Sequence, residues 1–297
     1  MNGNEHILQL PDNLNDIYAF DKVISMEDEL YAGRAGVLDL GNITFIEPYS
    51  MLGLLLIGKR FLKNTGTRLK LINPPVAVLQ YLYRMDFFNT RIFLTDEDLE
   101  SSKRLSRSAF SRRVIEVTEI PNAERESVAV ISRIVSLFRK RASYILRHWF
   151  SDDSVNYFVT VISEICQNVF EHSMDNGYLA LQTYTYNRDN VVRLAIADSG
   201  IGIEESFSEK QRKQFGHGAD LLKNALTKPI SGKREFGYGL CRVNSIIREM
   251  KGNLFVRSRS SSVAFVYNKG FSDGMYCFQK NDLEYFDGTQ ISISLYG

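Results

Sequence analysis

The sequence predicts two α/β domains in tandem. Signals for strands and helices alternate between residues 37 and 94, which is the pattern of a small α/β domain. A second series of long helices and recurring strands follows between residues 114 and 295. The length of 297 residues also suits two domains of ordinary size. We therefore place a first domain and its linker at residues 1–105 and a second domain at residues 106–297.

The composition predicts a globular protein with no surface dedicated to nucleic acid. Hydrophobic residues make up 44% of the chain and charged residues 24%, which is ordinary for soluble domains. The 36 basic residues nearly balance the 35 acidic ones, and the net charge of +1 argues against a nucleic-acid partner. The start of the chain does not read as a signal peptide, and the most apolar window, residues 51–57, is too short to cross a bilayer. We expect a cytoplasmic protein without a membrane partner.

The first domain is expected to begin its strand–helix alternation at residue 37. Residues 43–46 either continue the first strand or begin a turn, and Pro48 suits the start of a helix. Gly66 closes that helix, and alternating apolar residues mark the strand that follows it. The expected elements are strands at residues 37–40, 68–72 and 92–94 and helices at residues 51–62 and 76–84.

A change in charge separates the two domains. An acidic run at residues 96–100 is followed by a basic, serine-rich segment at residues 101–113. Charge runs of this kind are typical of linkers and interaction tails. We interpret the segment as a solvated linker, and a regulatory or docking segment is the alternative.

The second domain is expected to combine long helices with several strands. Residues 152–154 offer a cap for the helix that follows them. The segment of residues 204–236 is long and polar. The expected strands are 114–118, 179–186, 191–197, 254–256, 263–267, 275–278 and 291–295, and the other helices are 123–149, 154–172 and 239–250. The basic residues expected on the wet face of the first helix are Arg133, Arg139, Lys140, Arg141 and Arg147.

One helix, residues 154–172, carries two polar groups suited to chemistry. Its apolar residues form a core stripe, and Glu164, Asn168 and Glu171 fall on a neighbouring stripe. The amide oxygen of Asn168 suits Mg²⁺, which prefers oxygen ligands. The carboxylate of Glu164 could accept a proton from an attacking hydroxyl or water. A solvated polar face is the alternative when this pattern is taken alone.

Two glycine-rich segments follow. Asp198 ends a strand, and a carboxylate there can accept a hydrogen bond from an exocyclic amine such as adenine N6. Gly200 and Gly202 permit a tight turn and the close approach of a flat ring. The run from Gly237 through Tyr238, Gly239 and Leu240 precedes a helix, where exposed backbone N–H groups can hold phosphates. An ordinary turn and a simple helix entry are the alternatives.

The three cysteines, Cys166, Cys241 and Cys277, form no disulfide framework and have no zinc-ligand spacing. We expect buried, reduced thiols. Cys166 and Cys241 both fall in the segments of the expected pocket, so one of them is a candidate for alkylation.

In their order along the chain, these motifs resemble the GHKL ATP-binding fold, over about residues 110–297. The run at residues 162–173 is most similar to bacterial anti-sigma-factor serine kinases. The resemblance implies an α/β sandwich with helices on one face of a mixed sheet, and ATP and Mg²⁺ as ligands. The polar segment 204–236 would be a lid, and the alternative is a surface loop with one short helix at residues 219–226. The implied roles are Asn168 on Mg²⁺, Glu164 as base, Asp198 on adenine with Thr289 behind it, and Gly200, Gly202, Gly237, Tyr238, Gly239 and Leu240 around the nucleotide.

Residues 37–54 are similar to the STAS domain of anti-sigma antagonists, in which a strand leads to an acid, a phosphorylatable serine or threonine and a helix. Glu47 stands at the acid, Tyr49 falls where the phosphoacceptor is expected, and Ser50 follows. This departure puts the serine switch of that family in doubt. We expect Ser50 to cap the helix, and phosphorylation of Ser50 or Tyr49 is the alternative.

The histidines argue against a histidine kinase. His6 and His148 are the only histidines before the motifs, and His148 lacks the usual acidic follower. The leading hypothesis is a signalling protein that binds Mg·ATP and phosphorylates a serine or threonine of a regulatory partner, itself STAS-like or sigma-factor-like. The alternatives are a slow ATPase switch and a non-catalytic, nucleotide-stabilised interaction module, and a homodimer is left open. The sequence does not decide whether the protein is an enzyme.

Overall fold

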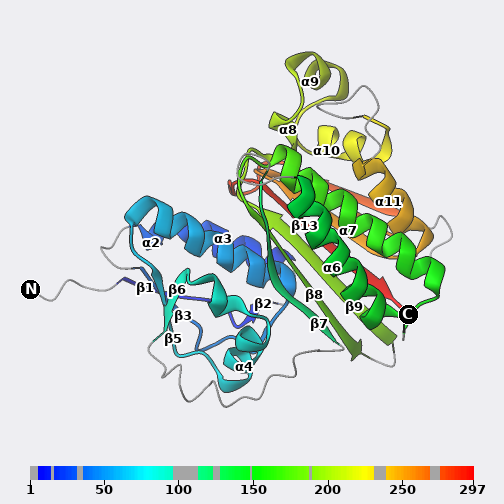
Figure 1. The fold of residues 1–297 in the computed structure, drawn as a ribbon. Helices are drawn as coiled ribbons and strands as arrows, with labels where there is room; N and C mark the ends of the chain where they lie inside the picture. Colours follow the sequence, from blue (N-terminus) through cyan, green and yellow to red (C-terminus); the bar gives the residue numbers. More distant parts are fainter. Residues whose placement is uncertain are drawn as a thin grey trace, which may run out of the picture. The chain divides into compact units, whose positions relative to one another are not determined.

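The computed structural model describes residues 6–14, 17–31, 36–95, 113–122, 128–147, 149–186, 189–230, 239–267 and 275–297. The chain divides into two compact units, Met1–Ser111 and Arg112–Gly297 (Figure 1). Each unit has buried apolar side chains of its own. The predicted domain boundary near residue 105 and most of the predicted linker lie outside the described residues.

The first unit is built on a four-stranded parallel sheet of order β1-β3-β5-β6. Parallel neighbours need crossover connections, and helices fill the intervals between the strands. The prediction of an α/β domain from residue 37 is confirmed, whereas β1, α1 and α2 were not predicted. The elements are β1 (His6–Gln9), α1 (Ile17–Ser25), α2 (Glu27–Leu30), β3 (Gly36–Asp39), α3 (Pro48–Thr65), β5 (Leu69–Ile72), α4 (Val76–Arg84), a 3₁₀ turn (Phe87–Thr90) and β6 (Phe93–Thr95); β2 (Asn13–Leu14) and β4 (Phe45–Ile46) pair separately.

Helix α3 begins at Pro48, with Glu47 at the N-cap. The prediction that Ser50 caps this helix is therefore wrong, because Ser50 already lies inside its first turn. Ser50 is fully buried and Tyr49 is 4% exposed. Gly66 ends the helix as predicted, with a φ of 72° and an N–H bond to the carbonyl of Leu62.

The second unit contains a seven-stranded sheet of order β12-β11-β10-β13-β9-β8-β7. All of its pairings among the residues described are antiparallel, so the expectation of a mixed sheet is wrong. The last strand of the chain lies in the middle of the sheet, between β9 and β10. The strands are β7 (Val114–Ile120), β8 (Gly177–Tyr186), β9 (Asp189–Asp198), β10 (Asn253–Ser258), β11 (Ser261–Val266), β12 (Tyr276–Lys280) and β13 (Thr289–Tyr296).

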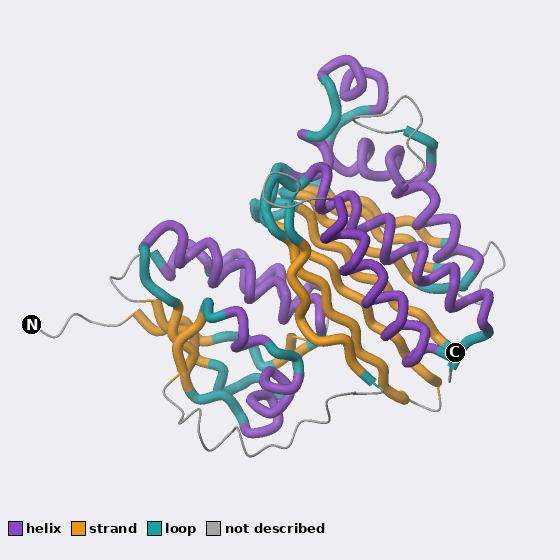
Figure 2. The backbone as a smooth tube through the Cα atoms, viewed as in Figure 1, coloured by secondary structure: helices purple, strands orange, loops and turns teal. Residues whose placement is uncertain are grey.

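Helices cover one face of this sheet (Figures 1 and 2). They pack side by side in the order α6, α7, α11 and α10, and one continuous core of buried apolar side chains lies between them and the strands. Their bounds are α6 (Val128–Leu146), α7 (Asp152–His172), α10 (Gly218–Thr227) and α11 (Gly239–Glu249). Within the described part of the chain, no helix has the length and hydropathy needed to span a membrane.

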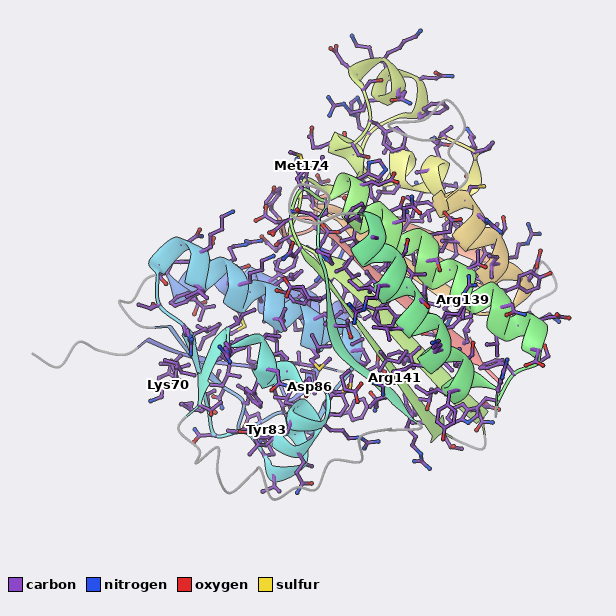
Figure 3. The ribbon with its side chains drawn as sticks, in the orientation of Figure 1. Lys70, Tyr83, Asp86, Arg139, Arg141 and Met174 are labelled. Atoms are coloured by element: carbon purple, nitrogen blue, oxygen red, sulfur yellow. The ribbon has the colours of Figure 1, made fainter. Side chains whose placement is uncertain are left out.

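Helix α6 presents most of its basic residues to solvent, as predicted. Arg141 is the exception, because it is half-buried and bonds Glu116 of β7 at 2.5 Å. Its other nitrogen donates to the carbonyl of Val114 at 3.1 Å. Figure 3 labels Arg139 and Arg141 on this helix. Arg141 therefore links α6 to β7, the edge strand of the sheet. The prediction that Arg141 lies on the solvent-exposed face of the helix is wrong.

Candidate functional site

A cavity lies at one end of the second unit, and its empty space, counted together with the solvent at its open mouth, is about 740 Å³. It is bounded by the last turns of α7, the end of β9, the first turn of α11 and the start of β13. Most of the exposed area of its walls is apolar, and the polar side chains that line it are Asn168, His172, Ser173, Asp198, Ser206 and Thr289. Such a mixture suits a flat apolar ligand that is oriented by a small number of polar contacts. The apolar walls are Ile165, Val169, Ile196, Ile203, Phe207, Ile230, Leu240 and Ile291.

Helix α7 carries the first polar group of the cavity. Its N-cap is Ser151, whose hydroxyl accepts a bond from the N–H of Ser154, so the predicted cap within residues 152–154 is wrong by one position. The predicted apolar stripe is buried in the core. Because this stripe fixes the rotation of the helix, Glu164 and Asn168 face α11 from a half-buried neighbouring stripe.

Asn168 lines the cavity with an amide that protein groups do not fully satisfy. Its Nδ2 is buried and has no hydrogen-bond partner among the residues described. A buried amide without a partner is costly, so a bound ligand group would relieve it. Among the described residues, no group of three or more acidic, histidine or cysteine side chains is placed to hold a metal ion. The residues present fit Mg²⁺ held by the Asn168 oxygen together with phosphates and waters, which is how this cation often binds.

Glu164 lies beside the cavity, at the contact between α7 and α11. Its Oε1 is 3.2 Å from Nη1 of Arg242, which belongs to α11. Its Oε2 would be 3.4 Å from a Cβ built on Gly239, and Oδ1 of Asn168 would be 3.6 Å from the same point. The structure therefore brings Glu164, Asn168 and Gly239 together, as predicted. Sequence reasoning missed Arg242.

Asp198 is a buried carboxylate at the end of β9, 4% exposed, that faces the cavity. Its Oδ1 accepts bonds from the hydroxyl of Ser173 at 2.9 Å and from the N–H of Gly200 at 2.8 Å. The register of β9 and β13 places Thr289 directly opposite Asp198, and Thr289 also lines the cavity. Ser173 was missed, because only the fold brings the end of α7 to the end of β9.

Two of the predicted glycines, Gly202 and Gly200, have different surroundings. Gly202 lines the cavity and has a φ of +77°, a conformation that favours glycine. Gly200 instead packs against α7, where an added Cβ would lie 1.8 Å from the carbonyl oxygen of Ser173. Gly200 does not line the cavity described here, and its expected place at the nucleotide stays a prediction.

The first turn of α11 brings the third motif to the cavity. Gly239 and Leu240 both line it, as predicted. The first residues of α11 expose backbone N–H groups that can bind anions. Gly237 and Tyr238, the other two predicted residues of this motif, lie outside the described residues.

The segment between β9 and α11 contributes one wall of the cavity. It contains α8 (Gly202–Glu205) and α9 (Glu209–Phe215) besides α10, so the alternative of a surface loop with one short helix is wrong. Ser208 and Gln211 form a capping box for α9. The N–H of Ile203 donates to the hydroxyl of Ser258 on β10 at 2.8 Å, which holds α8 against the sheet.

Glu204 links α8 to the start of α10. It is 2.8 Å from Nδ1 of His217 and accepts a bond from the N–H of Gly218 at the same distance. Partial burial opposes ionisation of Glu204, but the bonds from His217 and Gly218 outweigh it, so the pKa of this carboxyl lies below its usual value. The carboxylate therefore stays charged and fixes the entry to α10.

Comparison with known families agrees with this geometry. Residues 154–273 match the family described as histidine kinase-, DNA gyrase B-, and HSP90-like ATPase. A search of curated proteins finds no match to this chain. The matched segment is thus a GHKL-type ATPase domain, a class that implies ATP binding and an ATPase or kinase-like activity. It contains Glu164, Asn168, Asp198 and Gly239, whereas Thr289 lies beyond it.

Proposed function

We propose that this protein is a cytoplasmic signalling protein that binds Mg·ATP and phosphorylates a serine or threonine of a partner protein. One observation carries the proposal. Asn168 and Asp198, which stand apart in the sequence, line one cavity, and Glu164 lies beside it, all inside the segment that matches the ATPase family. The cavity has an apolar part for a base and a helix start for phosphates.

Each side chain has a role that follows from its chemistry. Asp198 would accept a hydrogen bond from the adenine amine, while the apolar walls contact the ring. Thr289, Gly202 and Leu240 would line the cavity around the same nucleotide. Asn168 would hold Mg²⁺, which neutralises phosphate charge when bound. The N–H groups at Gly239, together with Gly237 and Tyr238 before it, would bind the phosphates.

In the proposed reaction no covalent bond forms between the protein and the phosphate. The acceptor hydroxyl attacks the γ-phosphorus, the bond from this phosphorus to the bridging oxygen of ADP breaks, and the hydroxyl proton passes to Glu164. Positioning and charge neutralisation supply most of the catalysis in reactions of this type. Glu164 lies beside the Asn168 end of the cavity, which suits this role.

The first unit is proposed to be a STAS-like domain, supported by its parallel sheet and by the helix that begins at Pro48. Tyr49 and Ser50 are both buried, so neither hydroxyl is presented to a kinase in this conformation. We therefore place the phosphoacceptor on a separate regulatory partner, STAS-like or sigma-factor-like, rather than on α3.

A slow ATPase switch is the second candidate. It is favoured by the wall that the segment 202–230 contributes, because Ile203, Phe207 and Ile230 would contact a nucleotide and could transmit its presence. In that case water replaces the acceptor hydroxyl, and the γ-phosphate is released rather than transferred.

The deciding experiment follows labelled γ-phosphate in the presence of proteins encoded beside the gene. We expect label on a serine or threonine of one of them, and loss of this label in Glu164→Gln. Glu171→Gln is the matched control, because Glu171 lies two turns further along the same stripe of α7 and accepts a bond from Gln167 instead of contacting α11. Release of free phosphate alone would favour the switch. Binding with neither transfer nor release would favour a non-catalytic module.

A further inference from the structure

Arg242 lies on the side of α11 that faces α7. It is three residues beyond Gly239, and residues with this spacing share one side of a helix. Its guanidinium Nη1 is 3.2 Å from Oε1 of Glu164. The guanidinium therefore sits at the same corner of the site as the two groups proposed to act on the terminal phosphate, Glu164 and Asn168.

The ion pair between Arg242 and Glu164 is weakly protected from water. The Arg242 side chain is 56% exposed and that of Glu164 is 30% exposed. Ion pairs in such surroundings contribute little to stability, and a stronger partner displaces them easily. Arg242 is thus held near the cavity by a contact that costs little to break.

A terminal phosphate is such a partner. The residues that line the cavity in the described part of the chain include no lysine or arginine. A phosphate carries more charge than one carboxylate and accepts two parallel bonds from a guanidinium. The corner that holds Glu164, Asn168 and Gly239 is narrow, since Oε2 and Oδ1 both come within 3.6 Å of a Cβ built on Gly239. A short swing of Arg242 about its flexible stem would bring it to a phosphate there.

We infer that Arg242 distinguishes ATP from ADP, resting on Glu164 in the empty site and moving to the γ-phosphate when ATP binds. This inference rests on the proposed function of the cavity. Glu164 then has two roles. Its carboxylate pairs with the Arg242 guanidinium before ATP binds, and it can act as a base once the guanidinium has moved to the γ-phosphate. Because Arg242 leaves Glu164 only for a terminal phosphate, the Glu164 carboxylate is available as a base only when ATP is bound.

Two substitutions have opposite expected effects on ATP. Arg242→Ala removes the cation and lowers affinity for ATP about tenfold, while affinity for ADP changes less than twofold. Glu164→Gln removes the competing carboxylate, so Arg242 is free and affinity for ATP rises two- to fivefold. The double variant should bind ATP as weakly as Arg242→Ala, because the cation that Glu164→Gln frees is then absent.

The test is isothermal titration of the full chain with a non-hydrolysable ATP analogue and with ADP, both with Mg²⁺. Arg242→Lys should keep part of the preference for the analogue, because an ammonium lacks the guanidinium fork. Arg248→Ala, on the exposed side of the same helix, is the matched control and should change neither affinity. Circular dichroism confirms that each variant is folded.

The outcomes are distinguishable. Equal losses for both nucleotides in Arg242→Ala, or an unchanged preference in both Arg242 variants, would overturn the inference and leave the proposed function standing. A fall in ATP affinity in Glu164→Gln would also overturn it, because the carboxylate would then not compete for the cation. Failure of the folded natural protein to bind either nucleotide would overturn the proposed function and the inference together.

Discussion

The hydroxyl of Ser173 donates a hydrogen bond to Oδ1 of Asp198 at 2.9 Å, and both residues are only 4% exposed. This bond ties the end of α7 to the end of β9. The N–H of Gly200 donates to the same oxygen. Two donors on one oxygen fix the plane of the carboxylate, so its orientation in the cavity does not depend on a ligand.

We expect Asp198→Asn to weaken ATP binding by about tenfold or more, which corresponds to losing a hydrogen bond that involves a charged group. The amide also cannot accept from Ser173 and Gly200 as strongly as the carboxylate does. Isothermal titration measures the loss. Ser173→Ala should cause a smaller loss, since the bond from Gly200 remains. Undiminished binding in Asp198→Asn would show that the adenine lies elsewhere.

Two glycine substitutions should separate folding from binding. Gly200→Ala places a methyl group 1.8 Å from the Ser173 carbonyl oxygen, so we expect a large fall in the free energy of unfolding, about 2 kcal/mol or more. Gly239→Ala meets only ordinary contacts, the nearest at 3.4 Å, and should leave stability nearly unchanged. Urea denaturation measures both.

Gly239→Ala should nevertheless weaken ATP binding, because its methyl group would stand between Glu164, Asn168 and the start of α11. Isothermal titration of Gly239→Ala with ATP measures this loss of affinity. A variant that is stable and binds ATP normally would place the phosphates away from this helix start.

Asn168→Ala should remove the dependence of ATP binding on Mg²⁺. In the natural protein we expect chelation of Mg²⁺ to reduce ATP affinity about tenfold or more. In the variant the affinities with Mg²⁺ and with a chelator should converge on the lower value. Mn²⁺ titration followed by electron paramagnetic resonance provides an independent reading of the ion. A variant that keeps the full Mg²⁺ effect would assign the ion to other groups.

The cysteines should differ in their reaction with iodoacetamide. Burial raises the pKa of the Cys166 thiol to about 12, so this residue should stay unlabelled in the folded protein. Cys241, one residue beyond the cavity wall at Leu240, is partly accessible. Burial also raises the pKa of its thiol, so its labelling should accelerate as the pH rises through 9 and beyond.

ATP should slow labelling of Cys241 while leaving Cys277 unaffected. Cys277 is the matched control, because it is partly accessible, its thiol pKa is also raised by burial, and it lies on β12 away from the cavity. Peptide mass spectrometry follows each site separately. Equal protection of both cysteines would indicate a global change rather than a ligand at α11.

The sequence predicted the parts of the site that depend on local pattern. The apolar stripe of α7 fixes where Glu164 and Asn168 point, and a strand that ends at Asp198 is evident from its apolar run. The glycine entry to α11 was predicted in the same way. Each of these signals lies within a single element, so periodicity alone is sufficient to find it.

The features that were missed depend on contacts between elements. Two such contacts are the hydrogen bond from Ser173 to Asp198 and the ion pair of Glu164 with Arg242. Each joins residues far apart in the sequence, so no local sequence pattern predicts it. Helix α9 is different, because its capping box, from Ser208 to Gln211, could have been found in the sequence. The antiparallel sheet was also missed, because the expectation of a mixed sheet came from the family resemblance. The two-residue connection between β8 and β9 could have indicated antiparallel pairing of these two strands.

The most direct test of the account is isothermal titration of the intact, folded protein with ATP in the presence of Mg²⁺. We expect saturable binding with one ATP per chain, weakened by a chelator and by Asp198→Asn. Absence of binding, in a protein that circular dichroism shows to be folded, would contradict the assignment of this cavity to ATP.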